Sequence, residues 1–410
     1  MTAHDGDGSK AGFAALAVLL VVVFNNIAGF SLILPLLPFY GREFAASPFQ
    51  VTMLFAAYSF GNIFGEIYWG RASDRHGRKR VLMITISCAA LSYAAFAFAP
   101  TLAIALLVRI VSGFFSGTLS VVQSYIADIS KPQDRARFMG YFGAAFNLGF
   151  AVGPALGGLL AQPELGLAGF HRPIFTAAIF AGAAAFFAAF VLRESHAPGE
   201  ARPLPAYGDA FRFVADQPLL MRLFAIAFIG IGSFASMEGI FGLWTAQNFG
   251  WTARQVGMTF IAVGATGVVV QVLLIGPLSK RFGEARVIMI GLTVLALSMI
   301  LQPIIRQPIA SVMLMSLLMA GHSLAFPNVG ALLSRATPRA AQGSVMGLQM
   351  SSNALARICM PPFFGIIYAK AGADAPYYVC TGLVCIALYV ALHAVRLRDR
   401  QLTGELRADA

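Results

Sequence analysis

The sequence places a few ionisable residues inside long apolar stretches, where each is costly unless it has a role. Arg109 lies near the middle of the apolar segment 101–127, and Glu238 lies within Ser236-Met-Glu-Gly-Ile-Phe241. A guanidinium at that depth costs several kcal/mol unless it faces a polar interior and finds a partner. Apolar neighbours favour the neutral form of a carboxylate, so Glu238 is suited to take up and release a proton. A snorkelling or helix-capping role is the alternative for Arg109, and its distance from both ends of the segment opposes that role.

Other ionisable residues are further candidates. Glu66 is the second candidate for a proton carrier, although it lies one helical turn before Gly70 and could pair with a loop arginine instead. His322 is as compatible with packing as with binding, whereas Arg357 is expected to be functional. If both face inward, the ligand is anionic, zwitterionic or rich in hydrogen-bond acceptors. The residues expected to line a substrate cavity are Asn25, Asn26, Tyr58, Gln271, His322, Asn353 and Arg357.

A dense basic motif, Gly70-Arg-Ala-Ser-Asp-Arg-His-Gly-Arg-Lys-Arg80, separates two apolar stretches. It is too short to fold alone and is typical of a cytoplasmic loop between membrane helices. Its glycines let a helix end and turn tightly, Asp74 can cap the chain beyond it, and Arg78 can reach a carboxylate on a neighbouring helix. Asp128 is the expected partner. The alternative is that the loop only sets topology.

We expect this network to latch the two halves of the molecule in one state and to break during turnover. The predicted latch residues are Gly70, Asp74, Arg75, Gly77, Arg78 and Asp128.

The elements that position these residues are membrane helices. The chain is 58% hydrophobic and 11% charged with a mean hydropathy of +0.74, which indicates a polytopic membrane protein. Its net charge of +11 is confined to loops and ends, which favours topology over a nucleic-acid partner. Twelve spans are predicted, at about 14–38, 49–70, 81–99, 101–127, 138–161, 173–192, 220–246, 255–278, 287–304, 309–333, 342–368 and 376–396.

Most of the 29 Lys and Arg residues fall on the side of the two termini, which predicts that both termini are cytoplasmic. The N-terminal apolar run does not fit a cleaved signal peptide. The four cysteines all fall within predicted spans and fit packing rather than a metal or disulfide pattern. No nucleophile constellation, phosphate-binding loop or metal cluster is present in the sequence, so we expect neither an enzyme nor a cofactor.

The longest polar interval divides the chain into halves. We predict an N-terminal six-helix bundle at 1–192, a cytoplasmic linker at 193–219 and a C-terminal six-helix bundle at 220–410. Within the linker, residues 206–215 have the periodicity of a short amphipathic surface helix. The segment Gly276-Pro-Leu-Ser-Lys-Arg-Phe-Gly-Glu-Ala-Arg286 repeats the basic motif six spans later, with Lys280 in place of Asp74.

A motif of this kind after the second span, with a weaker copy six spans later, resembles the major facilitator superfamily over essentially the whole chain. Arg109-Ile-Val-Ser-Gly113 is similar to that superfamily's membrane-embedded arginine motif. The run Gly149-Phe-Ala-Val-Gly-Pro-Ala-Leu-Gly-Gly158 resembles the motif of its twelve-span exporters. Leu34-Pro-Leu-Leu-Pro38 and Arg193-Glu-Ser-His196, among other stretches, resemble the tetracycline/proton antiporter branch.

The resemblance implies a twelve-helix, all-α transporter of two pseudo-symmetric halves that works by alternating access. It also implies that Arg109 lies near the proton pathway and that the exporter motif favours export. The small residues of that motif allow close helix packing, which explains them equally well. The residues concerned are Gly149, Gly153, Pro154, Gly157 and Gly158.

The sequence departs from the tetracycline branch at the positions of its membrane acids. Asn26, Ser92 and Leu295 stand where that branch has acidic residues in the first, third and ninth spans. A cationic metal chelate would lack its expected counter-charges here. Whether tetracycline is carried is therefore open, and a proton carrier must lie elsewhere in the chain.

We therefore predict a proton-coupled exporter of amphipathic small molecules, acting as a monomer in a bacterial-type inner membrane. Its expected partners are a small-molecule substrate, protons and the lipid bilayer. The alternatives are an antiporter or facilitator of an organic anion or metabolite, and a non-transporting membrane receptor or scaffold. Competition by anionic against cationic substrates separates the two transport hypotheses.

Overall fold

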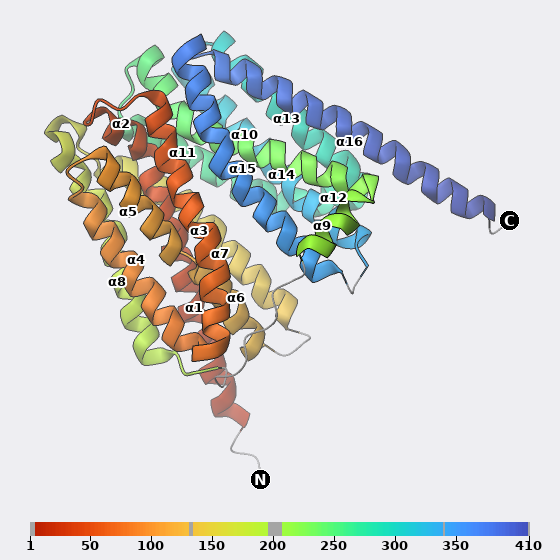
Figure 1. Cartoon of the computed structure of the whole chain (residues 1–410), viewed down its shortest axis with the longest axis horizontal. Coiled ribbons are helices and arrows are strands. Elements are labelled where there is room, and N and C mark those ends of the chain that lie inside the picture. Colours follow the sequence, from red (N-terminus) through yellow and green to blue (C-terminus); the bar gives the residue numbers. More distant parts are fainter. Residues whose placement is uncertain (1–4, 131–133, 196–206, 339–340, 409–410) are drawn as a thin grey trace. The chain divides into compact units, whose positions relative to one another are not determined.

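The computed structural model describes residues 5–130, 134–195, 207–338 and 341–408, and those residues form helices and short connections (Figure 1). The chain divides into two compact units. Unit 1 comprises Met1–Pro203 with Gly250–Gly264, and unit 2 comprises Leu204–Phe249 with Ala265–Ala410. Residues 250–264, which the sequence assigned to the C-terminal bundle, thus group with unit 1. The predicted linker boundary stays a prediction, and its residues 196–206 lie outside the described part of the chain.

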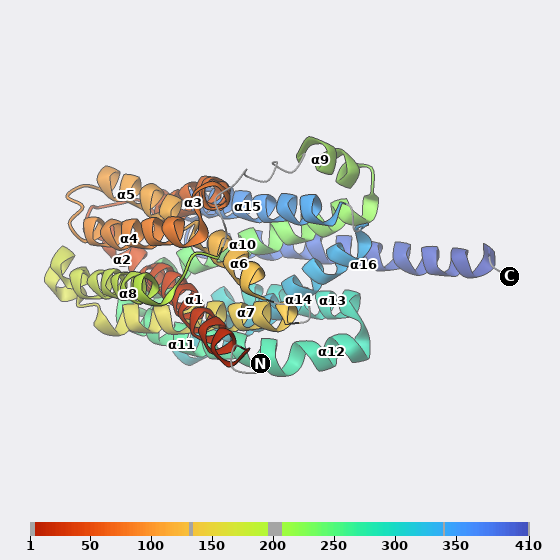
Figure 2. The same cartoon turned by 90° about the horizontal axis from the view of Figure 1, so that it is seen from below.

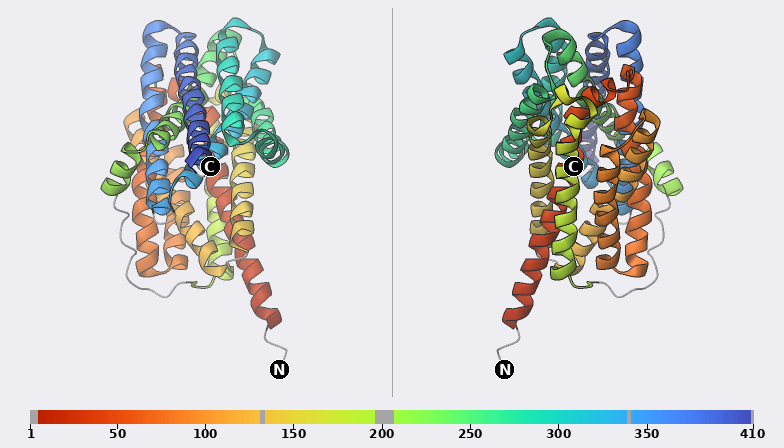
Figure 3. Two further views of the ribbon diagram at one scale, coloured as in Figure 1. Left: turned by 90° about the vertical axis from the view of Figure 1, so that its right-hand side faces the viewer. Right: turned by 90° about the vertical axis from the view of Figure 1, so that its left-hand side faces the viewer.

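The first half of the chain supplies most of unit 1, and its long helices run side by side (Figures 1 and 3). Its elements are α1 (Asp5–Ile33), η1 (Leu34–Leu36), α2 (Leu37–Arg42), α3 (Pro48–His76), α4 (Arg78–Ala97), α5 (Leu102–Phe115), α6 (Thr118–Ile129), α7 (Arg135–Leu160), η2 (Pro163–Phe170) and α8 (His171–Val191). The predicted span 101–127 is interrupted at Ser116-Gly117, so that α5 and α6 form its two parts.

The second half begins with α9, which occupies the segment predicted as a short amphipathic helix (Figure 2). Its elements are α9 (Tyr207–Ala215), α10 (Pro218–Phe249), α11 (Ala253–Val269), the π-helical turn η3 (Val270–Leu274), α12 (Ile275–Phe282), α13 (Glu284–Ile304), α14 (Pro308–Ala336), α15 (Gln342–Ala371) and α16 (Ala375–Ala408). The position of α9 at a membrane surface stays a prediction.

Within the described residues, ten helices are long and apolar enough to cross a membrane. Each corresponds to one of the twelve predicted spans. The other two predicted spans are α3 and α15, in which polar residues such as Asn62 and Asn353 lower the hydropathy. They contain 29 and 30 residues. At about 1.5 Å per residue, each is longer than the roughly 30 Å hydrocarbon core. The prediction of an all-α membrane protein is confirmed.

Glycines bring α3 and α5 into backbone contact. A Cβ atom added to Gly61 would lie 1.9 Å from the Ile110 carbonyl oxygen, and one added to Gly113 would lie 2.0 Å from the Tyr58 carbonyl oxygen. Only a residue without a Cβ permits this approach, so the two helices are locked in one register. This contact fixes the position of Arg109, which α5 carries one turn before Gly113.

The predicted exporter motif on α7 packs in the same way. Cβ atoms added to Gly149, Gly153 and Gly157 would lie 2.7, 2.1 and 2.0 Å from atoms of α1. One added to Gly158 would lie 2.5 Å from Gly257 Cα on the part of α11 that belongs to unit 1. Pro154 lies inside α7. The structure thus supplies the packing role of this motif, and its link to export stays a prediction.

Candidate functional site

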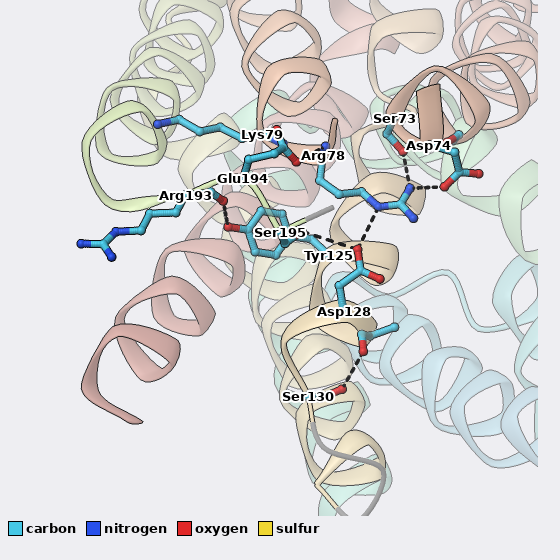
Figure 4. A network of polar contacts seen from close by, with 12 residues as sticks. Ser73, Asp74, Arg78, Lys79, Tyr125, Asp128, Ser130, Arg193, Glu194 and Ser195 are labelled. Carbon is cyan, nitrogen blue, oxygen red and sulfur yellow. Dashed lines mark hydrogen bonds and ion pairs between the residues drawn. The ribbon is translucent and has the colours of Figure 1, made fainter. Parts of the chain in front are cut away.

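Arg78 is the centre of a buried polar network at one end of unit 1 (Figure 4). Its side chain is 1% exposed and lies 2.6 Å from Asp74 Oδ1 and 3.1 Å from Asp128 Oδ2. One Nη also donates to Ser73 Oγ at 2.6 Å. The expected contact between Arg78 and Asp128 is therefore present. Because the two carboxylates surround one guanidinium, the network ties the ends of α3, α4 and α6 together.

The cap of α4 differs from the sequence prediction, which gave that role to Asp74. Gly77 is the N-cap residue and has no side chain, and Asp74 instead forms an ion pair with Arg78. The Glu194 carboxylate accepts from the backbone N–H groups of Arg78 at 2.5 Å and Lys79 at 3.2 Å. A carboxylate suits this position because the free N–H groups and the helix dipole both favour negative charge.

The segment after α8 completes the network. The Tyr125 hydroxyl donates to the Arg193 carbonyl oxygen, and Ser195 Oγ donates to Asp128 Oδ2 at 3.5 Å. Lys79 Nζ donates to the Ala189 carbonyl oxygen at 2.8 Å. The start of the predicted linker is thus held against the ends of α4 and α6. Every contact of this network that the structure describes lies within unit 1.

The second copy of the motif adopts the same turn. Gly283 has φ 80° between α12 and α13, as Gly77 has φ 93° between α3 and α4. Each glycine N–H donates to the carbonyl oxygen of a serine four residues earlier, Ser279 and Ser73 respectively. A positive φ of this size favours glycine, which explains why both copies have it.

The ion pair of the second copy has the opposite polarity. Glu284 follows Gly283 as Arg78 follows Gly77, and its carboxylate lies 3.0 Å from Arg335 at the end of α14. In the second copy the residue after the glycine is the anion Glu284, which pairs with a cation. In the first copy the residue after the glycine is the cation Arg78, which pairs with anions. The Arg335 side chain is 74% exposed. This pair is consequently weaker than the buried Arg78 network.

Arg109 is buried in an aromatic environment in unit 1. Its guanidinium carbon lies 4.7 Å from the Tyr58 ring centroid and 5.9 Å from those of Phe30 and Phe96. Its Nε donates to the Leu54 carbonyl oxygen of α3 at 3.2 Å, and neither Nη has a hydrogen-bond partner among the described residues. No carboxylate in that part of the chain lies within ion-pair distance of it. The hydrogen bond to Leu54 and the cation–π contacts are therefore the described interactions that stabilise this charge.

Glu238 and His322 belong to unit 2. Glu238 is 9% exposed, and its Oε1 has no partner among the described residues. The His322 ring stacks on Phe234 with centroids 4.1 Å apart and lies 4.5 Å from Phe326. Arg357 lies on α15 of the same unit and its side chain is exposed. His322 Nδ1 also has no hydrogen-bond partner in the described chain. Both buried atoms are therefore free to hydrogen-bond a ligand.

The remaining predicted cavity residues have varied environments. Asn25 donates to the Phe180 carbonyl oxygen at 3.0 Å, which joins α1 to α8, and Asn26 is half-buried. Gln271 lies in the π-helical turn η3. Asn353 Oδ1 has no partner among the described residues. The Glu66 carbonyl oxygen accepts from Ser120 Oγ at 3.3 Å.

A family model described as the Major Facilitator Superfamily matches residues 19–247 and 223–409. The chain belongs to the major facilitator superfamily. Members of this superfamily are transporters rather than enzymes. The predicted membership of the superfamily and the prediction that the chain is not an enzyme are thereby confirmed. The chain is related to resistance proteins. It is 32% identical to the class C tetracycline resistance protein of Escherichia coli over 397 aligned positions, and the match covers 93% of this chain and 96% of the relative.

Another relative in the superfamily is Multidrug resistance protein 2 of Bacillus subtilis (strain 168). It is 27% identical over 86% of this chain and 88% of its own length. A solved structure of a human organic anion transporter superposes with a TM-score of 0.68 at 23% identity, covering 93% of this chain and 99% of that one. A bacterial homologue of the human lysosomal transporter Spinster gives a TM-score of 0.77 at 14% identity, covering 93% and 96%. These two likenesses show the superfamily fold.

The structure also describes Ser92 and Leu295, two of the positions where we expect the tetracycline branch to have acidic residues. Ser92 is buried and donates to the Cys88 carbonyl oxygen at 2.7 Å, and Leu295 is fully buried. Both side chains are therefore used in helix packing.

Sequence reasoning missed Glu194, Glu284 and Arg335 as members of the polar networks. The alignment of the two motif copies carried a signal for Glu284, because it occupies the position of Arg78. No local signal identified Glu194, which lies 116 residues from its partner Arg78.

Proposed function

We propose that this transporter exports amphipathic small molecules from the cytoplasm in exchange for protons, by alternating access. Its relatives are named as tetracycline and multidrug resistance proteins and match most of its length. Both termini are cytoplasmic in this proposal, and the membrane is the bacterial cytoplasmic membrane. Its two halves contain 1–192 and 220–410, joined by the linker 193–219.

The observation that carries the proton coupling is Glu238, a buried carboxylate with an unpartnered Oε1 in the described chain. A buried acid of this kind is stable as the neutral group and gains a charge only when a compensating cation approaches. In the proposal Arg357 of α15 supplies that cation. Substrate binding and protonation at Glu238 then compete, which couples export to proton entry. Glu66 is the second candidate for this role.

Arg109 and the Arg78 network have different roles in the proposal. Arg109 holds a fixed charge beside the proton or substrate pathway. Asp74, Arg78 and Asp128 hold the ends of three helices together in one conformation, and turnover requires their release. Gly70 and Gly77 shape the turn of this network and Arg75 adds positive charge. That the network also latches the two halves stays a prediction.

The test is transport in proteoliposomes loaded at acidic pH, with lumenal pH recorded as lipophilic cations, tetracyclines and organic anions are added in turn. Alkalinisation driven by a substrate is the expected result. Glu238→Gln should bind substrate and exchange it without moving protons, whereas the matched variant Glu66→Gln should keep the coupling. Wild-type pH dependence in Glu238→Gln together with its loss in Glu66→Gln would transfer the role to Glu66.

A second candidate function is exchange or facilitated transport of an organic anion. It is favoured by Arg109, which has no carboxylate partner in the described chain, and by the positive charge of Arg357 on α15 of unit 2. An anionic substrate would supply the missing counter-charge. Inhibition of transport by anionic but not cationic competitors would support this function over export of cationic amphiphiles.

A further inference from the structure

A surface groove on unit 1 has an apolar wall, and none of its lining residues takes part in the ion pairs described above. It has a volume of about 460 Å³. Phe64, Ile67 and Tyr68 of α3 form its wall together with Phe114 of α5, and the Tyr68 and Phe114 rings lie 5.6 Å apart. The three α3 side chains are 53%, 41% and 56% exposed. This surface, the α3 groove, is large enough for a ligand because binding pockets span roughly 300–1,000 Å³.

One end of the α3 groove is basic. Arg71, Arg75 and His76 line it at the end of α3. Arg71 and Arg75 are four residues apart, so their side chains project from the same face of the helix. Both are exposed, and no carboxylate of the described chain lies within ion-pair distance of either. They differ in this from Arg78, whose charge is matched by Asp74 and Asp128.

The order of these features along α3 has a chemical meaning. The aromatic wall lies toward the middle of the span, and the arginines lie where the helix leaves the apolar region. In the proposed topology this end is cytoplasmic, and the cytoplasmic leaflet carries anionic lipid. A phospholipid has the same polarity, with acyl chains in the hydrocarbon core and a phosphate at the interface. A small soluble anion would gain nothing from the exposed Phe64 and Tyr68 rings.

We propose that the α3 groove binds an anionic phospholipid of the cytoplasmic leaflet. Its phosphate lies against Arg71 and Arg75, and an acyl chain lies along Phe64, Tyr68 and Phe114. The binding rests on the proposed orientation of the chain but not on the identity of the substrate. Because α3 also carries Asp74 one residue before Arg75, bound lipid lies beside the Arg78 network and stabilises the conformation in which the groove is formed.

The test is native mass spectrometry of the purified full chain in detergent. It is titrated with phosphatidylglycerol and with phosphatidylcholine of the same acyl chains. We expect phosphatidylglycerol to be retained with roughly tenfold preference, since each basic residue near a lipid surface contributes to the attraction. Arg71→Gln with Arg75→Gln should abolish the preference, and Arg71→Lys with Arg75→Lys should keep most of it.

Two controls make the result specific to the groove. Arg80→Gln with Arg281→Gln removes the same charge from exposed positions outside the groove and should leave the preference unchanged. Glycerol phosphate is added as a competitor without acyl chains and should not displace the lipid. Equal retention of the two lipids by the wild type, or an unchanged preference in the double Gln variant, would overturn the proposal. Displacement by glycerol phosphate at matched concentration would replace it with a site for soluble anions. Failure of substrate transport leaves this measurement unaffected, so the two proposals fail independently.

Discussion

At the scale of single residues, burial decides which charges matter. Arg78 and Arg109 are both 1% exposed, yet their surroundings differ. Arg78 has two carboxylate partners, whereas Arg109 has aromatic rings and one carbonyl oxygen among the described residues. A guanidinium is planar and spreads its charge, so it can stack on Tyr58 in a way that an ammonium group cannot. The charge of Arg109 therefore stays available to a substrate or proton carrier.

Arg109→Lys keeps the charge but loses the planar guanidinium that lies over the Tyr58 ring, and Arg109→Ala loses both. We expect proton-coupled transport to fall by about tenfold or more in Arg109→Lys, because rigid placement of the charge is lost, and to be abolished in Arg109→Ala. Flux in proteoliposomes measures this, with thermal unfolding as the check on folding. Wild-type flux in both folded variants would contradict a central role for Arg109.

The cap provided by Glu194 gives a second prediction at this scale. Glu194→Ala leaves the first N–H groups of α4 without their carboxylate, which should cost about 0.5–2 kcal/mol of stability. Hydrogen exchange should quicken at Arg78 and Lys79 before it changes elsewhere in α4. Glu164 is exposed and forms no ion pair among the described residues, so Glu164→Ala is the matched control. Equal exchange in both variants would show that the cap is dispensable.

At the scale of elements, glycine contacts determine how closely the helices of unit 1 approach. Gly65 faces the Phe114 carbonyl oxygen, which an added Cβ would meet at 2.0 Å. Gly182 lies within α8, and a Cβ added there would meet nothing within 4 Å. The two glycines share a helical backbone and differ in their surroundings, so the same substitution should have opposite effects.

Gly182→Ala should raise stability by about 0.5–1 kcal/mol, because alanine is the better helix former. Gly65→Ala should lower it by about 1–3 kcal/mol, because α3 and α5 must separate. Thermal unfolding in one detergent gives both values. A stabilising effect of Gly65→Ala would contradict the close contact between these helices. Since Arg109 lies on α5, its position should shift as well, and transport should fall in Gly65→Ala alone.

At the scale of the whole molecule, the two copies of the basic motif share a turn but differ in their charges. Arg78 is enclosed by carboxylates, whereas the pair of Glu284 and Arg335 is reversed in sign and largely exposed on the arginine side. Screening by solvent weakens an exposed pair, and a buried network broken at one member leaves uncompensated charge. The pseudo-symmetric halves are therefore unequal in how firmly their helix ends are tied.

This inequality predicts that Arg78→Ala costs about 3–5 kcal/mol, because Asp74 and Asp128 lose their cation. Arg335→Ala should cost about 1 kcal/mol or less. Unfolding in denaturant measures the two losses of stability, and transport rates measure their effect on function. The double variant Glu284→Arg with Arg335→Glu reverses both charges and should restore the stability that Arg335→Glu alone removes. Equal costs at Arg78 and Arg335 would contradict the asymmetry.

The sequence by itself determined the membrane class, the helices that match the predicted spans, the repeated basic motif and the family. These features are encoded locally, in apolar runs of fixed length and in the spacing of glycines and charges within one loop. The contact between Arg78 and Asp128 could also be predicted from the sequence, because Asp128 is an acid at the end of a nearby span.

Only the tertiary structure decided what surrounds each charge. The capping of α4 by Glu194, the reversed pair of Glu284 and Arg335, and the aromatic surroundings of Arg109 all join residues that are far apart in the sequence. Helical periodicity assigns a residue to a face but does not say which neighbour covers that face. That choice depends on how closely the backbones approach, and in unit 1 it is made by contacts such as those of Gly61 and Gly113.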